Sequence, residues 1–274
     1  MSTGGPTEWA AVALAAARAG AAAVTAIRLA DALDTATKSA AHDFVTAADR
    51  AAEEAVISTI RDAFPDDAIL SEESGSHAGT TSVRWIVDPV DGTANVVYGR
   101  DEHAVSVGVE NDGVIVAGAV LRPADGRWGV AAGGELRLGR DTAGTPDDGA
   151  PGAPLRNPTT SAEALVVVSM PYPLHLRVRV LTVLTGLIPD LRAMRMVGSA
   201  ACDLLSVASG QADAYLAFGL SPWDTAGGQA LVEAAGGVVR RIADSDFEVL
   251  IAGDADVAAD LERRLRALGV GAAA

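Results

Sequence analysis

Residues 85–95 read WIVDPVDGTAN, and this stretch carries most of what the chain reveals about its fold and chemistry. Asp88 follows an apolar strand, where a carboxylate emerges at the rim of a sheet. Pro89 restricts one backbone angle, and Gly92 permits a tight turn in which successive N–H groups point one way. Such a turn binds an anion, and Asp88 and Asp91 beside it offer oxygen ligands for a hard cation. The stretch therefore predicts metal-assisted phosphoryl transfer on an α/β scaffold.

Three further segments concentrate acidic residues beside Gly, Ser or Thr. They are residues 43–49 (DFVTAAD), 71–75 (SEESG) and 223–237 (WDTAGGQALVEAAGG). Taken singly, each segment also fits an ordinary turn or helix cap, because Asp, Ser and Gly are common in both. Taken together with residues 85–95, they predict one cluster of carboxylates.

In this order the four segments resemble the inositol monophosphatase family, the Mg²⁺-dependent, lithium-sensitive phosphatases. The family pattern runs D-x-V-T-x-x-D, G/S-E-E, W-x-x-D-P-x-D-G-T-x-N and W-D-x-A-G/A-G…E-A-G-G, and the resemblance covers roughly residues 7–265. It implies an α/β (layered α+β) fold, the αβαβα five-layer sandwich of the inositol monophosphatase and fructose-1,6-bisphosphatase type. It also implies a homodimer.

The resemblance assigns roles to individual residues of this chain. Two or three Mg²⁺ ions are expected on the ligands Glu72, Asp88, the backbone carbonyl of Val90, Asp91 and Asp224. The expected catalytic residues are Asp49, Thr93 and Glu72: Thr93 and Asp49 position and deprotonate an attacking water, and Glu72 helps to hold a third metal ion through water. Backbone amides of Gly92 and Thr93 are expected to bind phosphate. The expected substrate contacts are Asp91, Ser199, Ala200 and Ala217, with Ser199 and Ala200 in the segment RMVGSAA (195–201).

Departures from the family pattern concern the substrate rather than the metal ligands. Ala217 stands where inositol-specific members have a Glu, Val96 replaces a usual Phe, and residues 139–160 lack the usual G-A-x-x-N-G wording. Inositol 1-phosphate is the leading substrate. Histidinol phosphate, fructose 1,6-bisphosphate and 3′-phosphoadenosine 5′-phosphate are alternatives. An alternative of another class is a non-catalytic scaffold that partners RNA-associated machinery.

Other catalytic classes fit the sequence poorly. The haloacid-dehalogenase type needs D-x-D, but two residues separate Asp88 from Asp91. There is no Gly-x-Ser-x-Gly elbow for a serine hydrolase. The four histidines show no paired metal-ligand spacing, which disfavours zinc chemistry.

Composition limits partners and compartment. The 274 residues carry 21 Lys and Arg against 36 Asp and Glu, a net charge of −15, which argues against nucleic-acid binding. The family resemblance implies a small phosphate monoester as the partner. The single cysteine, Cys202, excludes an internal disulfide, so we expect a cytoplasmic protein. Residues 9–27 are nearly all apolar, but Arg18 at their centre and their helical spacing predict a packing helix rather than a membrane span.

Hydrophobic periodicity predicts alternating helices and strands. Helices are expected at about 7–34, 46–63, 174–188, 199–209, 223–235 and 254–268. Strands are expected at 68–71, 83–87, 103–109, 114–121, 127–131, 164–169, 193–197, 212–217, 237–242 and 247–251, with a hairpin at 111–113. Residues 1–138 form a first half and 161–274 a second. The Gly- and Pro-rich residues 139–160 form a surface loop or seam between them within one catalytic unit.

Overall fold

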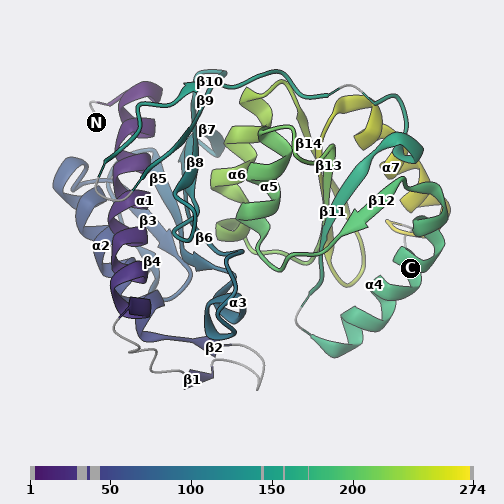
Figure 1. Cartoon of the computed structure of the whole chain (residues 1–274), viewed down its shortest axis with the longest axis horizontal. Coiled ribbons are helices and arrows are strands. Elements are labelled where there is room, and N and C mark those ends of the chain that lie inside the picture. Colours follow the sequence, from purple (N-terminus) through teal and green to yellow (C-terminus); the bar gives the residue numbers. More distant parts are fainter. Residues whose placement is uncertain are drawn as a thin grey trace.

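The computed structural model describes residues 4–29, 36–37, 44–142, 145–156, 158–171 and 173–271. Its elements form five layers, in which helices lie outside and between two β-sheets. The five layers follow one another from left to right in Figure 1. This arrangement confirms the expected αβαβα sandwich. The division of the chain at 139–160 stays a prediction.

The first sheet has eight strands in the order β10-β9-β8-β7-β6-β5-β3-β4. They are β3 (Ala68–Ser71), β4 (Gly75–His77), β5 (Val83–Asp91), β6 (Ala104–Asn111), β7 (Val114–Leu121), β8 (Arg127–Ala132), β9 (Glu135–Arg140) and β10 (Ala150–Pro151). Its neighbours run antiparallel except for β3 and β5, which are parallel. A separate two-stranded sheet pairs β1 (Ala36–Thr37) with β2 (Phe44–Val45).

The second sheet has five strands in the order β12-β11-β13-β15-β14. They are β11 (Leu165–Ser169), β12 (Ala193–Arg195), β13 (Ala214–Phe218), β14 (Val238–Ala243) and β15 (Glu248–Gly253). The central strand β13 is buried along its whole length, because helices cover both faces of this sheet.

The described residues form seven α-helices, and six of them supply the other three layers. The seven helices are α1 (Pro6–Leu29), α2 (Ala47–Ala63), α3 (Thr93–Val97), α4 (Leu174–Leu187), α5 (Ala200–Ala208), α6 (Pro222–Ala234) and α7 (Ala255–Ala267). Helices α1 and α2 cover the outer face of the first sheet, α5 and α6 lie between the sheets, and α4 and α7 cover the outer face of the second sheet (Figure 1). The short α3 lies outside these layers, directly after β5.

Helix α1 is long and apolar enough to cross a membrane by length and composition. Its small side chains are nevertheless buried against α2 and strands β6 to β8, with Ala13, Ala16 and Ala17 fully inaccessible to solvent. Arg18 pairs with Asp141 at 2.8 Å. Because one face packs on the sheet and carries an ion pair, α1 serves here as the core helix that the sequence predicted.

The hairpin between β6 and β7 confirms the turn expected at 111–113. Asp112 and Gly113 both have positive φ, 50° and 81°, the backbone that a two-residue hairpin loop requires. Strands β4, β9 and β10 were not predicted, and β9 and β10 place paired strand residues inside the segment expected to be a loop. The expected end of the first helix, at 34, lies outside the described residues.

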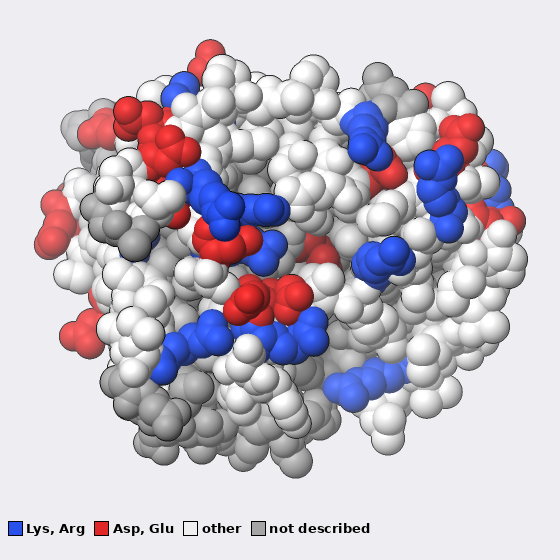
Figure 2. All heavy atoms as spheres, in the orientation of Figure 1, with Lys and Arg blue, Asp and Glu red and all other residues white. Residues whose placement is uncertain are grey.

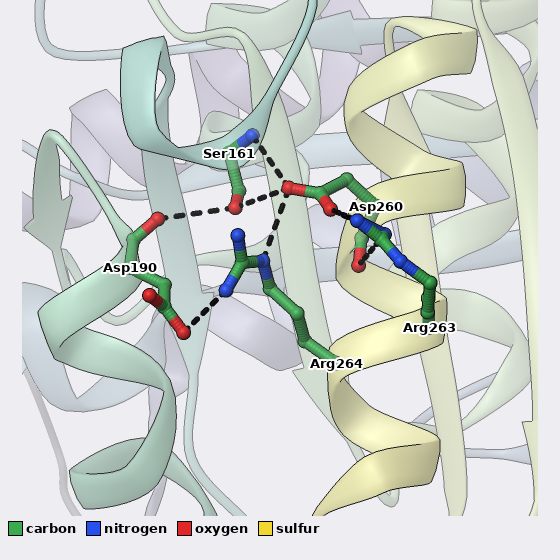
Figure 3. A network of polar contacts seen from close by, with 5 residues as sticks. All are labelled: Ser161, Asp190, Asp260, Arg263 and Arg264. Atoms are coloured by element: carbon green, nitrogen blue, oxygen red, sulfur yellow. Dashed lines mark hydrogen bonds and ion pairs between the residues drawn. The ribbon is translucent and has the colours of Figure 1, made fainter.

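Helix α7 is tied to the rest of the second half by Asp260, which is buried (Figure 3). One Asp260 oxygen accepts hydrogen bonds from the Ser161 amide at 3.0 Å and the Ser161 hydroxyl at 2.6 Å. Arg263 and Arg264 pair with the same carboxylate, and Arg264 also pairs with Asp190. These donors lower the pKa of Asp260 to about 2 against the effect of burial, so the network is ionic at neutral pH.

Candidate active site

Strand β5 delivers two of the expected metal ligands, Asp88 and Asp91. The strand continues through both residues, but its register against β6 shifts between them, so a β-bulge separates the two aspartates. Pro89 lies in this bulge, where its missing N–H costs no ladder hydrogen bond. The bulge lets two carboxylates separated by only two residues serve one site. Both are buried, with Asp88 1% and Asp91 8% exposed.

Helix α6 brings Asp224 to the same place. One oxygen from each of Asp88, Asp91 and Asp224 lies within 4.8 Å of the others. Asp224 is the third residue of the helix, and it accepts a hydrogen bond from the Ser221 amide at 2.6 Å. This capping contact orients the side chain toward β5 and explains why the carboxylate stands at the start of a helix.

Glu72 approaches the cluster from the turn after β3. Its amide donates to the Val87 carbonyl at 3.1 Å, which fixes this turn beside β5. Its negative charge acts on both Asp88 and Asp91, and its side chain lines the same cavity. All four expected carboxylate ligands are therefore brought together.

The electrostatics of this cluster favour a bound cation. Burial, followed by the charges of Glu72, Asp91 and Asp224, raises the pKa of Asp88 well above its ordinary value. Burial raises the pKa of Asp91 to about 6, although hydrogen bonds from Ser199 and Ala201 oppose the shift. Buried carboxylates that repel one another destabilise the folded state unless a positive charge is bound between them. The donor set, all hard oxygen, fits Mg²⁺.

Asp91 is also held by the first turn of α5. One Asp91 oxygen accepts hydrogen bonds from the Ser199 hydroxyl and the Ala201 amide, both at 2.6 Å. The segment 195–201 therefore acts on the site by positioning a metal ligand. Ser199 is 1% exposed and does not line the cavity, so its expected direct contact with substrate has no support in this geometry.

Asp49 and Thr93 form a second, adjoining pair. The Thr93 hydroxyl lies 2.8 Å from Asp49 Oδ1 and 3.0 Å from the Val90 carbonyl oxygen. The other Asp49 oxygen accepts from the Thr46 amide at 2.8 Å and the Thr46 hydroxyl at 2.6 Å, forming the capping box of α2. Thr46 is the N-cap residue of this helix. With both oxygens of Asp49 engaged, the Thr93 hydroxyl is rigidly oriented at the cavity wall.

Gly92 links β5 to α3 in a conformation that a side chain would disturb. Its φ is 91°, and a Cβ atom there would lie 2.9 Å from the Glu102 carbonyl oxygen and 3.2 Å from the Gly198 carbonyl oxygen. The first amides of α3 follow at once, and such amides have no acceptor within their own helix. Gly92 and Thr93 thus lie where the sequence expected phosphate-binding amides, at the edge of the cavity.

These residues surround one cavity of about 770 Å³. Glu72, Val90, Asp224 and Ala200 line it, as do the bulge aspartates. An apolar part of its wall is made by Met170, Pro171, Met196, Leu220 and Trp223. Ala217 is fully buried in β13 and does not line the cavity, so its expected substrate contact is not observed among the described residues.

Two site residues were missed by sequence reasoning. Arg177, near the start of α4, is the single basic residue among the described residues that line the cavity, and its Nε donates to the Pro171 carbonyl at 2.9 Å. Glu53 on α2 accepts hydrogen bonds from the Ser71 hydroxyl and the Ser74 amide, and so holds the turn that carries Glu72. Glu53 stands one helical turn after Asp49, a spacing that signals a shared face. No local pattern marks Arg177.

Comparison with known proteins agrees with this geometry. The family model described as "Inositol monophosphatase family" matches residues 6–272. The chain is 35% identical over 211 residues to a protein of Pasteurella multocida named Nus factor SuhB, covering 76% of this chain and 75% of that protein. It is 36% identical over 208 residues to a protein of Mycobacterium leprae named inositol-1-monophosphatase, covering 74% and 70%.

Solved structures show the same fold. A structure described as Mycobacterium tuberculosis SuhB matches with a TM-score of 0.82 at 29% identity, over 97% of this chain and 99% of that one. The extragenic suppressor protein suhB of Bartonella henselae matches with a TM-score of 0.81, also at 29% identity, over 93% and 97%. The likeness therefore spans both halves of the sandwich.

Proposed function

Because the chain belongs to the inositol monophosphatase family, we propose that it is a Mg²⁺-dependent phosphomonoesterase acting on a small phosphorylated polyol, with inositol 1-phosphate as the first candidate. The observation that carries the proposal is the convergence of four carboxylates on one cavity beside the Thr93–Asp49 pair. Two or three Mg²⁺ ions on Glu72, Asp88, the Val90 carbonyl, Asp91 and Asp224 would supply a more acidic water and neutralise the phosphate charge.

The chain's own residues divide the remaining work. Asp49 accepts a hydrogen bond from the Thr93 hydroxyl, which leaves a lone pair of the Thr93 oxygen to accept a hydrogen bond from a water molecule in the cavity. Oriented in this way, the water faces the phosphate bound at the amides of Gly92 and Thr93. Displacement in line with the leaving oxygen then needs no covalent enzyme intermediate.

Two features bear on the identity of the substrate. The relative named inositol-1-monophosphatase supports inositol 1-phosphate. Ala217 cannot offer the carboxylate that inositol-specific members place in this strand, and Arg177 adds a positive charge to the apolar wall. Fructose 1,6-bisphosphate and 3′-phosphoadenosine 5′-phosphate, which carry a second anionic group, therefore remain candidate substrates beside histidinol phosphate.

The test is release of inorganic phosphate from these four substrates, with Mg²⁺, with EDTA, and with Mg²⁺ plus Li⁺. We expect Mg²⁺-dependent, Li⁺-inhibited release, with the highest kcat/KM for inositol 1-phosphate. The matched variant Asp224→Asn keeps the helix cap through its amide oxygen but removes one metal ligand, and it should be inactive while folded. Equal, very low rates on all four substrates would contradict the proposal.

The second candidate function is association with the transcription machinery. It is favoured by the relatives named Nus factor SuhB. The net charge of −15 argues that such a role would use a protein partner rather than RNA directly. The complete carboxylate set argues that catalysis would accompany this role. Pull-down of purified transcription proteins by the wild type and the inactive Asp224→Asn variant separates the two functions, since only binding should survive the substitution.

We also propose that the protein is a cytoplasmic homodimer. Helix α4 and the turn after it present a row of exposed apolar side chains: Leu174, Val178, Leu181 and Ile188. The first three follow helical spacing on one face, and an uncovered apolar row of this kind is typical of a subunit interface. Leu181→Glu should convert a dimer to a monomer in light scattering. A wild-type monomer would contradict this part of the proposal.

A further inference from the structure

A second cavity lies away from the carboxylate cluster, where β8 and β9 face α5. Its volume is about 470 Å³, a size typical of small-molecule sites. The end of β9 forms part of its wall through Gly139 and Arg140, and the segment after β9 contributes Asp147. Figure 2 shows basic and acidic side chains gathered on this face, over the region of β8 and β9.

Three arginines from different segments line this cavity: Arg122 follows β7, Arg127 begins β8 and Arg140 ends β9. Asp125 pairs with two of them, at 3.3 Å from Arg122 and 3.5 Å from Arg127. Arg140 donates its Nε to the Asp125 backbone carbonyl at 2.9 Å and has no carboxylate partner among the described residues. Its remaining guanidinium donors are therefore available to a ligand.

The balance of charge at this cavity opposes that of the whole chain. Three guanidinium groups face two carboxylates, Asp125 and Asp147. Asp147 is already committed to the protein, because its two oxygens accept hydrogen bonds from the amides of Arg140 and Gly149. In addition, Nε of Arg122 is buried without a hydrogen-bond partner in the described structure. A local positive excess on a protein of net charge −15 favours an anionic ligand.

The rest of the lining is apolar or neutral. Leu138 of β9 and Leu205 of α5 line it together with Trp128, whose Nε1 donates to Asp141 at 2.9 Å. Ser206 and Gln211 offer neutral hydrogen-bonding groups. Guanidinium groups recognise phosphate and carboxylate through paired donors, and the leucines suit a small ring or chain attached to the anion.

We propose that this cavity, formed by β8, β9 and α5, is a second binding site, for a small organic anion that carries a phosphate, phosphonate or carboxylate on a compact apolar group. It needs no metal, in contrast to the catalytic cavity. Helix α5 separates the two sites: Cys202 and Leu205 line the new cavity, while Ser199 and the Ala201 amide hold Asp91. An occupant therefore contacts the helix that positions a metal ligand.

The experiment is calorimetric titration of the full-length protein with phenylphosphonate, which combines the two chemistries and cannot be hydrolysed as an ester. The titration is performed with Mg²⁺ and again with EDTA, because binding at the catalytic cavity requires the metal. Arg140→Ala removes the guanidinium without a carboxylate partner. Arg137→Ala is the matched control, since it removes the same charge from the same strand outside the cavity.

We expect one binding event that persists in EDTA, is weakened about tenfold or more by Arg140→Ala, and is little changed by Arg137→Ala. Ser206→Glu, which adds a negative charge to the lining, should weaken it similarly. Absence of metal-independent binding at millimolar phenylphosphonate would overturn the proposal. So would equal weakening by Arg137→Ala, which indicates general charge attraction, or displacement by an RNA oligonucleotide at lower concentration, which indicates an extended polyanion surface.

Discussion

Asp91→Asn tests the metal site through two quantities, the stability of the metal-free protein and the rate of phosphate release. We expect the substitution to raise the first and lower the second. Burial raises the pKa of Asp91 from 3.8 to about 6. A carboxyl whose pKa is higher in the folded state destabilises the fold as pH rises through 3.8 to about 6, and the full cost, about 3 kcal/mol, applies at pH 7. An amide carries no charge and escapes this cost.

The hydrogen bonds at α5 are already included in this cost, because they lower the pKa of Asp91 and the value of about 6 remains after their effect. The amide oxygen of the asparagine can accept from the same Ser199 hydroxyl and Ala201 amide. The metal-free variant should therefore be more stable than the wild type by about 3 kcal/mol at pH 7, which raises the midpoint of thermal unfolding by roughly 6 to 12 °C.

Activity should change in the opposite sense. Loss of the Asp91 carboxylate as a metal ligand removes several kcal/mol of transition-state stabilisation. The rate of phosphate release should therefore fall by at least about 10³-fold. Saturating Mg²⁺ should stabilise the wild type, by about 2.7 kcal/mol at a hundredfold excess over its Kd, and the variant far less. The measurements are thermal unfolding in EDTA and in Mg²⁺, and steady-state phosphate release, on the same preparations.

A matched control is Asp203→Asn on α5. Asp203 is equally buried, and burial raises its pKa to about 8, so the side chain is mostly uncharged at pH 7. Its replacement should leave both activity and the Mg²⁺ response near wild type. The reasoning is refuted if Asp91→Asn unfolds at a lower temperature than the wild type in EDTA, or if it keeps more than about a tenth of the activity.

Three further substitutions test other parts of the structure. Thr93→Val removes the hydroxyl that bonds Asp49, so kcat should fall by about 10²-fold or more with KM little changed, as measured by initial rates. Gly92→Ala places a Cβ within 2.9 Å of a backbone carbonyl, so it should abolish activity and lower stability in urea by about 1 to 3 kcal/mol, whereas Gly113→Ala, with positive φ but open space, should cost less and leave activity intact. Asp260→Asn weakens the hydrogen bonds from Ser161 and removes the ion pairs with two arginines. It should lower the free energy of unfolding by about 2 kcal/mol, measured in urea at pH 7. The difference should shrink as pH falls from 3.8 toward about 2, where Asp260 of the wild type becomes protonated.

Much of the site was predictable because its ligands lie in short local patterns. Asp88 and Asp91 lie in the last part of strand β5, and Asp224 lies in the first turn of helix α6; such positions meet at one edge of a layered fold. The sequence predicted that strand β5 ends at 87. In the structure Pro89 lies in a bulge, which tolerates the missing N–H and continues the strand to Asp91.

The remaining features arise from tertiary packing that no local pattern encodes. Arg177 reaches the cavity from a helix remote in sequence, and Ala217, expected to contact the substrate, is buried beneath it. The second cavity combines Arg122, Arg140 and Leu205, which only the packing of β9 against α5 brings together. Strand β9 itself was missed because its alternation of charged and apolar residues is brief and is followed by Gly- and Pro-rich chain.

The central claim is that carboxylates from separate segments form one divalent-cation site. Mn²⁺, a hard cation with an anomalous X-ray signal, tests it directly in crystals soaked with the ion. We predict anomalous peaks about 2.0 to 2.6 Å from oxygens of Asp88, Asp91 and Asp224, with Glu72 and the Val90 carbonyl completing the ligand set. Crystals soaked to saturation in Mn²⁺ that show no anomalous peak between these three aspartates would contradict the account.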